Sequence, residues 1–367
     1  MKHKNICLTI HSLATHGGEE RMCVLLANEL SKRGYNVIIV TLNQFINEKS
    51  WFKVNDSIKT YTLRKNRYER KIFSYKLLEG LPLFRYKRIL KNNNISIVVD
   101  VDIHQSLVTT KVTKGTDIKV ISWDHFNYER FRKRWSYQIM LDCFHSGEVD
   151  KLVLLTKADI QPYLDEEKFS PSFIHQIYNP SPIEVDNYTE HNSKKVLAVG
   201  RYNEQKGFDL LLECWTIVEH QCNDWELEIV GDGPMRSSLE EQIRTLHLKN
   251  VRLSHYTDNI IEKYRDASIY VLSSRYEGFP LVLLETLALS LPIVSFDCKT
   301  GPNEIIKDGY NGFLVEPENV QILAEKVLIL INDDKLREQI SKNAFEESKK
   351  YKIDNIISQW EKLIESL

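Results

Sequence analysis

The sequence predicts an α/β protein made of two doubly wound domains, each with a parallel β-sheet covered by helices on both faces. Short runs rich in Val, Ile and Leu alternate with helical patterns. The alternation stops in a stretch rich in Pro, Asn and Ser and then starts again. The length of 367 residues also exceeds what one hydrophobic core usually serves. We therefore expect one domain over residues 1–180 and a second over residues 181–350.

The predicted strands of the first half are continuous apolar runs, as expected for parallel strands buried on both faces. They are ICLTI (6–10), NVIIVTL (36–42), ISIVVDV (95–101), KVISW (119–123) and KLVLLT (151–156). A helix that ends at Gly34 separates the first two runs. The stretch IYNPSPIEVDNYTEHNSKK (177–195) has the composition of a linker.

The second half repeats the pattern after this linker. Its predicted strands are KVLAVG (195–200), WELEIVG (225–231), NVRLS (250–254), SIYVLSS (268–274) and LPIVSF (291–296). Strands that alternate with helices form parallel sheets, and ligands bind beyond the carboxyl ends of such strands. The two domains are expected to face each other across a cleft, with their chemistry in the loops that follow strands.

Composition limits the class of protein. The hydrophobic fraction is 42% and the charged fraction is 27%, as in an ordinary globular protein. Six scattered cysteines without a Cys-x-x-Cys pair predict reduced thiols rather than disulfides or a metal site. We expect neither a signal peptide nor a spanning helix, because the N-terminus runs straight into a strand and no apolar run reaches 18 residues. These features predict a cytoplasmic protein.

Charge is unevenly distributed along the chain. The net charge is −2 overall, but it is +9 over residues 1–180 and −11 over the remainder. Residues 64–91 hold ten basic and two acidic residues among aromatic and aliphatic ones. This pattern is typical of a basic amphipathic segment at an anionic membrane surface, and equally of a solvated helix that covers its own core. No nucleic-acid binding motif accompanies it.

Two strand-end loops in the first half are candidates for a site. Gly17 and Gly18 precede a helix start, where a substrate could approach free backbone N–H groups, although a simple tight turn is an equal alternative. The lone Gly-x-Gly at VGDGPM (230–235) is not a dinucleotide fingerprint, which disfavours a nicotinamide dehydrogenase. Asp100 and Asp102 imitate a metal-binding Asp-x-Asp, an arrangement more often due to coincidence.

The stretch RYEGFPLVLLETLALSLP (275–292) predicts a phosphate site. Pro280 suits the first position of a helix, and the N–H groups of Leu281, Val282 and Leu283 would then lack helical acceptors. The helix dipole favours a diphosphate there, and Gly278 lets the loop pass close to the ligand. Such a site is expected to bind a nucleoside diphosphate.

Carboxylates and cations flank the predicted phosphate site. Glu277 and Glu285 can accept hydrogen bonds from sugar hydroxyls on either side of a diphosphate, one from a hexose and one from a ribose. Arg201 and Lys206, in the loop after the first strand of the same domain, would stabilise the charge that grows when the sugar leaves. A solvated helix residue is the alternative for Glu285, but its neighbours are nearly all apolar.

The motifs GRYNEQKG, VGDGP, EGFPLVLLE and GPNEIIKDGYNGFLV, in this order, resemble those of the retaining glycosyltransferases of family 4, which have the two-domain GT-B fold. The resemblance covers most of the C-terminal half. In the N-terminal half it rests on Gly17 and Gly18 and on ISWDHFNYER, where His125 matches a histidine often found beside the donor sugar. Trp123 and Phe126 could instead make His125 a packing residue, and Asp124 is expected to face the other way.

The resemblance implies transfer of a hexose or N-acetylhexosamine from a UDP-sugar, with retention, to a saccharide acceptor that we expect to be lipid-linked, in the assembly of a cell-surface polysaccharide or glycan. It implies no metal and no cofactor besides the donor, and a helix at about 351–367 that crosses back to the first domain. The expected catalytic residues are His125, Arg201, Lys206 and Glu277. The expected donor-binding residues are Gly17, Gly18, Arg201, Lys206, Glu277, Gly278, Phe279, Pro280, Leu281, Val282 and Glu285.

No acidic residue lies at an obvious position for a covalent nucleophile, which favours front-face transfer, in which the leaving phosphate helps to deprotonate the acceptor. The expected partners are the nucleotide-sugar, a lipid-linked or oligosaccharide acceptor and the inner face of an anionic membrane, and nucleic acid is not expected. Two alternatives remain: a UDP-sugar epimerase of the same fold, and a non-catalytic nucleotide-sugar-binding subunit, which would have lost cations or carboxylates.

Overall fold

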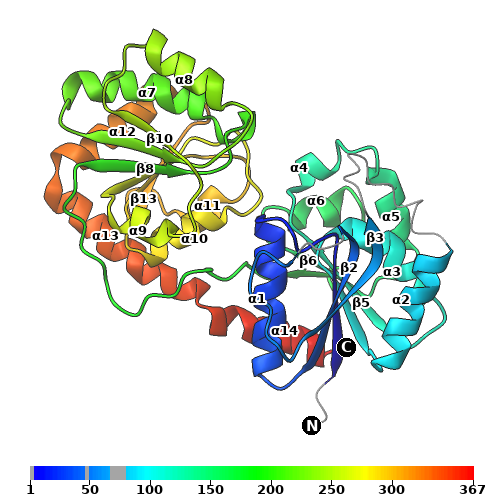
Figure 1. Cartoon of the computed structure of the whole chain (residues 1–367). Helices are drawn as coiled ribbons and strands as arrows, with labels where there is room; N and C mark the ends of the chain where they lie inside the picture. Colours follow the sequence, from blue (N-terminus) through cyan, green and yellow to red (C-terminus); the bar gives the residue numbers. More distant parts are fainter. Residues whose placement is uncertain (1–3, 46–48, 67–79) are drawn as a thin grey trace. The chain divides into compact units, whose positions relative to one another are not determined.

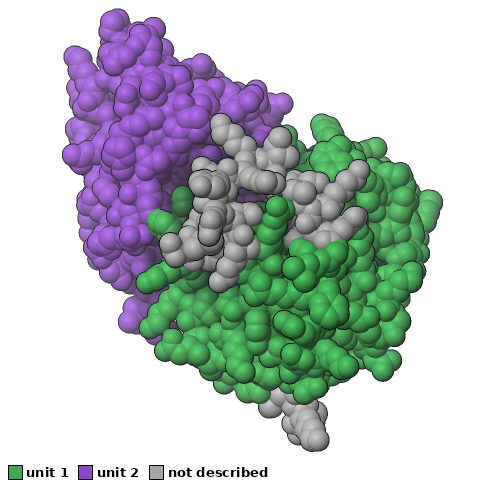
Figure 2. Space-filling model, turned by 45° about the vertical axis from the view of Figure 1, so that its right-hand side comes forward, with its two compact units in different colours: residues 1–182, 354–367 green, residues 183–353 purple. Residues whose placement is uncertain are grey.

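The computed structural model describes residues 4–45, 49–66 and 80–367, and its elements are arranged as Figure 1 shows. The chain divides into two compact units, coloured separately in Figure 2. Unit 1 comprises Met1–Pro182 and Asp354–Leu367, and unit 2 comprises Ile183–Ile353. Both units are Rossmann-like: each holds one parallel sheet with helices on its faces.

Unit 1 contains a seven-stranded sheet in the order β3-β2-β1-β4-β5-β6-β7. All its neighbouring strands pair in parallel. The strands are β1 (Asn5–Ile10), β2 (Asn36–Phe45), β3 (Lys59–Asn66), β4 (Ile97–Asp100), β5 (Lys119–Asp124), β6 (Lys151–Leu154) and β7 (Ile174–Gln176). The helices are α1 (Gly18–Lys32), α2 (Leu81–Asn92), α3 (Ser106–Thr113), α4 (Tyr128–Phe131), α5 (Tyr137–His145) and α6 (Ile160–Asp165), with a 3-10 helix η2 (Ile103–Gln105).

Two helix layers cover the sheet of unit 1. On one face, α2 and α3 bury Tyr86, Ile89 and Val108 against strand residues such as Val40 and Val98. On the other face lie α1 and α14 (Ile353–Glu365), which is the C-terminal helix predicted from the sequence. The guanidinium of Arg33, at the end of α1, lies 2.6 Å from the carboxylate of Asp354 and also pairs with Glu361. Residues distant in sequence therefore complete unit 1.

Unit 2 contains a six-stranded parallel sheet in the order β10-β9-β8-β11-β12-β13. Its strands are β8 (Lys195–Val199), β9 (Glu226–Val230), β10 (Val251–Ser254), β11 (Ile269–Leu272), β12 (Ile293–Phe296) and β13 (Gly312–Val315). Its helices are α7 (Phe208–Gln221), α8 (Arg236–Thr245), α9 (Ile260–Arg265), α10 (Leu281–Ala288), α11 (Pro302–Ile305), α12 (Val320–Asn332) and α13 (Asp334–Ser348), with 3-10 helices η3 (Glu204–Lys206) and η4 (Lys349–Tyr351). A core cluster that includes Trp215, Trp225 and Val327 joins α7 and α12 to the sheet.

The predicted class, two parallel doubly wound sheets, is confirmed, but three strands were not predicted: β3, β7 and β13. Within the described ranges, no helix is both long and apolar enough to cross a membrane. All six cysteines are free thiols. Part of the predicted basic segment, residues 67–79, lies outside the described residues, and its remainder forms the end of β3 and helix α2.

Candidate active site

The centre of the candidate site in unit 2 is an ion pair between Lys206 and Glu277. The Lys206 Nζ lies 2.7 Å from the Glu277 Oε1, and the two side chains are only 16% and 7% exposed. Lys206 ends η3, whose first turn is capped by the side chain of Asn203. Glu277 lies in the loop after β11. The pair therefore joins two loops that leave neighbouring strands of the sheet, β8 and β11.

A glycine makes this junction possible. Gly207, directly after Lys206, has φ of +59°, and a Cβ there would lie 2.1 Å from the backbone oxygen of Ser273. The Ser273 hydroxyl in turn donates to the carbonyl of Lys206 at 2.9 Å. Any larger residue at 207 would push apart the loops that carry Lys206 and Glu277.

The glycines of VGDGP also allow two loops to approach each other closely. A Cβ on Gly231 would lie 1.9 Å from the carbonyl oxygen of Gly200, and a Cβ on Gly233 would lie 2.4 Å from that of Tyr202. The loop after β9 thus packs directly on the backbone of the loop after β8, which carries Arg201. This motif shapes the site through backbone contact.

A fourth loop supports Glu277 from the side of β12. The Thr300 hydroxyl donates to the carbonyl of Glu277 at 2.8 Å. Gly301, from the GPNE motif, has φ of +95°, and a Cβ there would lie 2.5 Å from the carbonyl oxygen of Gly278. The loops after β8 and β12 therefore hold the segment that leads into α10, and the loop after β9 supports the loop after β8.

Helix α10 corrects one detail of the predicted phosphate site. The helix begins at Leu281, so Pro280 is the residue before the helix rather than its first residue. The N–H of Leu283 donates to the carbonyl of Pro280 at 3.0 Å, so it is not available to a ligand as predicted. The N–H groups of Leu281 and Val282 have no acceptor within the helix, because they belong to its first turn. These two groups remain the candidate phosphate donors.

Glu285 lies inside α10 and is buried, as its apolar neighbours predicted. The hydroxyl of Tyr264, on α9, donates to its Oε2 at 2.7 Å. Burial raises the pKa of the fully buried Tyr270, and the negative charges of Glu285 and Glu277 raise it further. Glu285 therefore has a protein partner, Tyr264, that the sequence did not reveal.

Arg201 differs from Lys206. It lies in the loop directly after β8 and is exposed. Among the residues that the structure describes, its guanidinium forms no ion pair or side-chain hydrogen bond. Unit 2 thus contains Lys206, which is held by a carboxylate, and Arg201, which has no such partner among the described residues. An anionic ligand would gain most from the second.

His125 lies in unit 1, immediately after β5. Its ring packs against Trp123 at a tilt of 45°, with 4.4 Å between ring centroids, and Trp123 packs edge-on against Trp360 of α14 at 4.8 Å. Burial lowers the pKa of His125 to about 4, against a smaller opposing effect of Asp102. Its Nε2 has no hydrogen-bond partner among the described residues. His125 is therefore packed against Trp123 with a buried Nε2, and its place beside the donor sugar stays a prediction.

Gly17 and Gly18 lie where the sequence placed them. Gly17 precedes α1 with extended φ and ψ of −77° and 168°, without a side-chain cap, and Gly18 is the first residue of the helix. Glu19, in the same first turn, was not predicted as part of a site. Its pKa is raised well above the usual value by burial first, and then by the charges of Asp102 and Glu20. No sequence motif marks Glu19, because the charges that act on it come partly from Asp102, which is distant in sequence.

Asp100 and Asp102 serve unit 1 itself. The buried Asp100 accepts hydrogen bonds from Ser106 at 2.9 Å and Thr109 at 2.6 Å, and burial raises its pKa to about 7. Asp102 accepts from the backbone and ring of His104 at 2.9 and 2.8 Å. Across residues 4–45, 49–66 and 80–367, no group of three or more His, Cys, Asp or Glu side chains could hold a metal ion.

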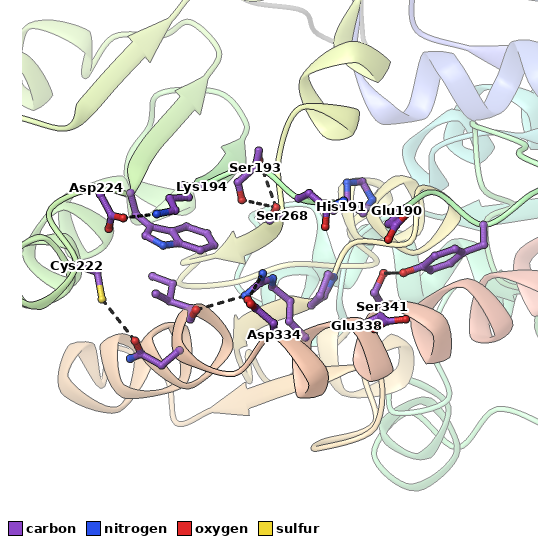
Figure 3. Close-up of a pocket in the computed structure, with 17 residues that line it drawn as sticks. Glu190, His191, Ser193, Lys194, Cys222, Asp224, Ser268, Asp334, Glu338 and Ser341 are labelled. Atoms are coloured by element: carbon purple, nitrogen blue, oxygen red, sulfur yellow. Dashed lines mark hydrogen bonds and ion pairs between the residues drawn. The ribbon is translucent and has the colours of Figure 1, made fainter.

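A separate pocket of about 480 Å³ lies at the opposite edge of the unit 2 sheet (Figure 3). Its lining includes Lys194, Trp225, Ser268 and Pro292, the residues that precede β8, β9, β11 and β12. None of the predicted donor-binding residues lines it. Lys194 and Asp224 pair across its wall. The pocket is therefore distinct from the candidate active site at the carboxyl ends of the strands.

Two Rossmann-like units in one chain are the architecture of the GT-B glycosyltransferases. Residues 183–347 match the family model "Glycosyl transferases group 1". An uncharacterized glycosyltransferase of Haemophilus influenzae is 30% identical over 98% of this chain and 100% of its own length. The chain belongs to the group 1 glycosyltransferase family.

Two further proteins extend the comparison. A Campylobacter jejuni transferase named for adding N-acetyl-D-galactosamine to a PP-undecaprenol-linked saccharide is 26% identical over 99% of this chain and 98% of its own. The structure of Anabaena HepE in complex with UDP and glucose has a TM-score of 0.79 at 16% identity, covering both chains fully. That structural likeness shows the shared fold.

Proposed function

We propose that this glycosyltransferase moves a hexose or N-acetylhexosamine from a UDP-sugar to a lipid-linked saccharide, with retention at the anomeric carbon, during assembly of a cell-surface polysaccharide or glycan. The observation that carries the proposal is the grouping of Arg201, Lys206, Glu277 and the N-terminus of α10 at one edge of the unit 2 sheet. Cations with helix N–H groups suit a diphosphate, and buried carboxylates suit hydroxyls.

Each residue has a proposed role. Arg201, Lys206 and the N–H groups of Leu281 and Val282 bind the diphosphate beside Gly278 and Phe279. Glu277 accepts hydrogen bonds from the donor sugar, and Glu285 accepts them from the ribose. Gly17 and Gly18 let the donor approach the start of α1, and His125, whose pKa burial lowers to about 4, lies beside the sugar as a neutral imidazole. The cations Arg201 and Lys206 replace a metal ion, so the reaction needs no metal.

The proposed step is front-face substitution. The bond between the anomeric carbon and the phosphate oxygen breaks, and its electron pair leaves with UDP. The acceptor hydroxyl forms the new bond on the same face, and its proton passes to the departing phosphate oxygen. Arg201 and Lys206 stabilise the negative charge that grows on that phosphate, which is where preorganised cations accelerate a reaction most.

The acceptor and location follow from charge. The net charge of +9 over residues 1–180, concentrated at 64–91, suits an anionic membrane surface on the cytoplasmic side. The Campylobacter relative's undecaprenol-linked acceptor supports a lipid-linked saccharide here. UDP and glucose bound to the Anabaena protein support the UDP-sugar donor.

The test is a panel of UDP-sugars, each incubated with purified protein, with and without a polyprenyl-linked saccharide. We expect UDP release to depend on the acceptor, and nuclear magnetic resonance of the product to show the anomeric configuration of the donor. Release of UDP with an epimerised free sugar, independent of acceptor, would instead identify an epimerase. Binding of UDP-sugar without turnover on any acceptor would identify a non-catalytic subunit.

A further inference from the structure

Large apolar side chains are exposed in an unusual place on unit 1. Four of them lie at the starts of two helices: Leu81 and Phe84 on α2, and Trp135 and Ile139 beside and within the first turn of α5. Trp135 is 81% exposed and Leu81 is 79% exposed. Scattered exposed apolar residues need no explanation, but paired ones at matching positions suggest an interaction surface.

The turn that carries Trp135 is fixed from beneath. Ser136 is buried, and its hydroxyl lies 2.7 Å from the Nε2 of His104, whose Nδ1 is bonded to Asp102. Phe131, on the other side of the turn, is fully buried. Trp135 therefore projects outward because its neighbours are anchored in the core. A rigid aromatic residue that projects into solvent is already organised for contact with a partner.

The charge around these side chains selects the partner. Arg132, Lys133 and Arg134 precede Trp135 and are exposed; Arg132 pairs with Glu166 at 3.0 Å, so Lys133 and Arg134 carry most of the excess charge. Helix α2 adds exposed Lys87 and Arg88 and contains no acidic residue. A Trp beside Arg and Lys is the combination that anchors proteins at the headgroup level of a bilayer. Positive charge adds attraction to anionic lipid. A bilayer interface suits this surface better than a protein partner of mixed charge.

The surface lies on the same edge of the unit 1 sheet as His125. In a βα unit the helix starts where the strand ends, so the starts of α2 and α5 are at the carboxyl edge. His125 follows β5 directly, and α4 and α5 follow His125 in sequence. Helices α2, α3 and α5 lie along the same face of the sheet (Figure 1), since α3 contacts both α2 and α5.

We propose that the turn 132–135 together with Ile139 extends the membrane contact of the basic segment 64–91, whose last part is the start of α2 with Leu81 and Phe84, and that the two together seat the carboxyl edge of the unit 1 sheet against an anionic bilayer. The proposal deepens the proposed function, since a lipid-linked acceptor would then meet His125 without leaving the membrane. The contact itself does not depend on which sugar is transferred.

The experiment measures sedimentation with vesicles of phosphatidylcholine alone and of an equimolar mixture with phosphatidylglycerol. The full chain should bind only the mixed vesicles, and Trp135→Ala with Ile139→Ala should weaken binding by about tenfold or more. Tyr310→Ala, which removes an exposed aromatic residue of unit 2, is the matched control and should bind as the parent does. Brominated lipid should quench fluorescence in the parent but markedly less in Trp135→Phe.

A water-soluble short-chain acceptor separates this inference from the proposed function. The double variant should keep UDP-sugar turnover on that acceptor and lose it on the vesicle-bound one. If the variant binds vesicles like the parent but fails on the soluble acceptor, Trp135 is a saccharide-stacking residue and the inference is wrong. If the parent ignores all vesicles, or if the double variant only changes the oligomeric state, the inference is also wrong, while turnover on the soluble acceptor would leave glycosyl transfer intact.

Discussion

The ammonium nitrogen of Lys206 lies 2.7 Å from Oε1 of Glu277, and this contact connects the loop after β8 to the loop after β11. The two proposed donor contacts are therefore one unit: each orients the other before any ligand binds. The charges are largely removed from water, so the loss of one leaves the other in an unfavourable environment.

We predict that Lys206→Met and Glu277→Gln each lower the free energy of unfolding by about 3 kcal/mol, because each leaves one buried charge without this partner. The double variant should lose clearly less than the sum of the two, and urea unfolding of all four proteins measures the coupling. Lys206→Met should also lower the catalytic rate by about a hundredfold. Additive losses of stability would contradict a coupled pair.

Arg201→Ala should separate catalysis from stability. The side chain is exposed, so its removal should change the free energy of unfolding by less than about 0.5 kcal/mol. The rate should nevertheless fall by about a hundredfold, because a cation on the leaving diphosphate is lost. Arg252→Ala, another exposed arginine of unit 2, is the control and should leave turnover unchanged.

The same cations predict the response to chelation. If Arg201 and Lys206 carry the charge of the diphosphate, EDTA should leave the rate of the parent protein nearly unchanged, as measured by UDP release. A strict requirement for added divalent metal would contradict this account of leaving-group stabilisation.

Glu285 allows a test of ribose recognition against a purely structural role. Glu285→Ala should weaken UDP-sugar binding by about 1.5 to 3 kcal/mol, because the ribose hydroxyls lose an ionised acceptor. Tyr264→Phe removes the hydroxyl that donates to Glu285 and leaves the carboxylate in place, so it should lower stability by about 1 kcal/mol with little effect on affinity. Calorimetric titration with UDP measures the affinity of both variants, and urea unfolding measures their stability. Equal losses of affinity in the two variants would favour a structural role.

His125 predicts a pH dependence of stability. Its pKa in the folded protein is about 4, below the usual value near 6.5, so the unfolded chain binds more protons between these values. Its contribution therefore makes the protein less stable as the pH falls from 6.5 towards 4. Asp100 and Asp124, whose pKa values burial raises to about 7, act in the opposite direction.

Because Asp100 and Asp124 act in the opposite direction, the effect of His125 on stability is measured as the difference between the parent and a His125 variant. His125→Gln should lose less stability than the parent when urea unfolding is repeated at pH 5 instead of pH 7. His220→Gln, which replaces an exposed histidine, should follow the parent. A ring signal of His125 that titrates near pH 6.5 would show that the imidazole is not desolvated as described.

The strands that sequence reasoning missed share one property. β3 and β7 are the two edges of the unit 1 sheet, and β13 is an edge of the unit 2 sheet. A central parallel strand is covered on both faces and gives a continuous apolar run, whereas an edge strand such as KTYTLRKN carries polar residues along its open side. The continuous apolar pattern is therefore lost in β3, but an edge position alone does not decide the outcome: edge strand β10 was predicted, and β13, with the apolar sequence GFLV, was missed.

The candidate site also has parts that the sequence predicted and parts that it did not. Lys206, Glu277 and the start of α10 could be placed because each follows a strand within one short motif. Tyr264, the partner of Glu285, and Trp360, which supports Trp123 under His125, contact the site from elements distant in sequence. Such contacts depend on packing, which a single sequence does not display. The one-residue shift at Pro280 reflects the usual uncertainty of a helix start.

The position of α14 has a consequence for biosynthesis. Unit 1 needs Asp354–Leu367, which include buried Trp360 and Ile357, yet all of unit 2 is translated before these residues. Domains tend to fold as their chain emerges. Here the second unit is complete first, while the nascent first unit still exposes Trp123 and the apolar face that α14 covers. We therefore expect the nascent chain to be most prone to aggregate just before α14 is synthesised.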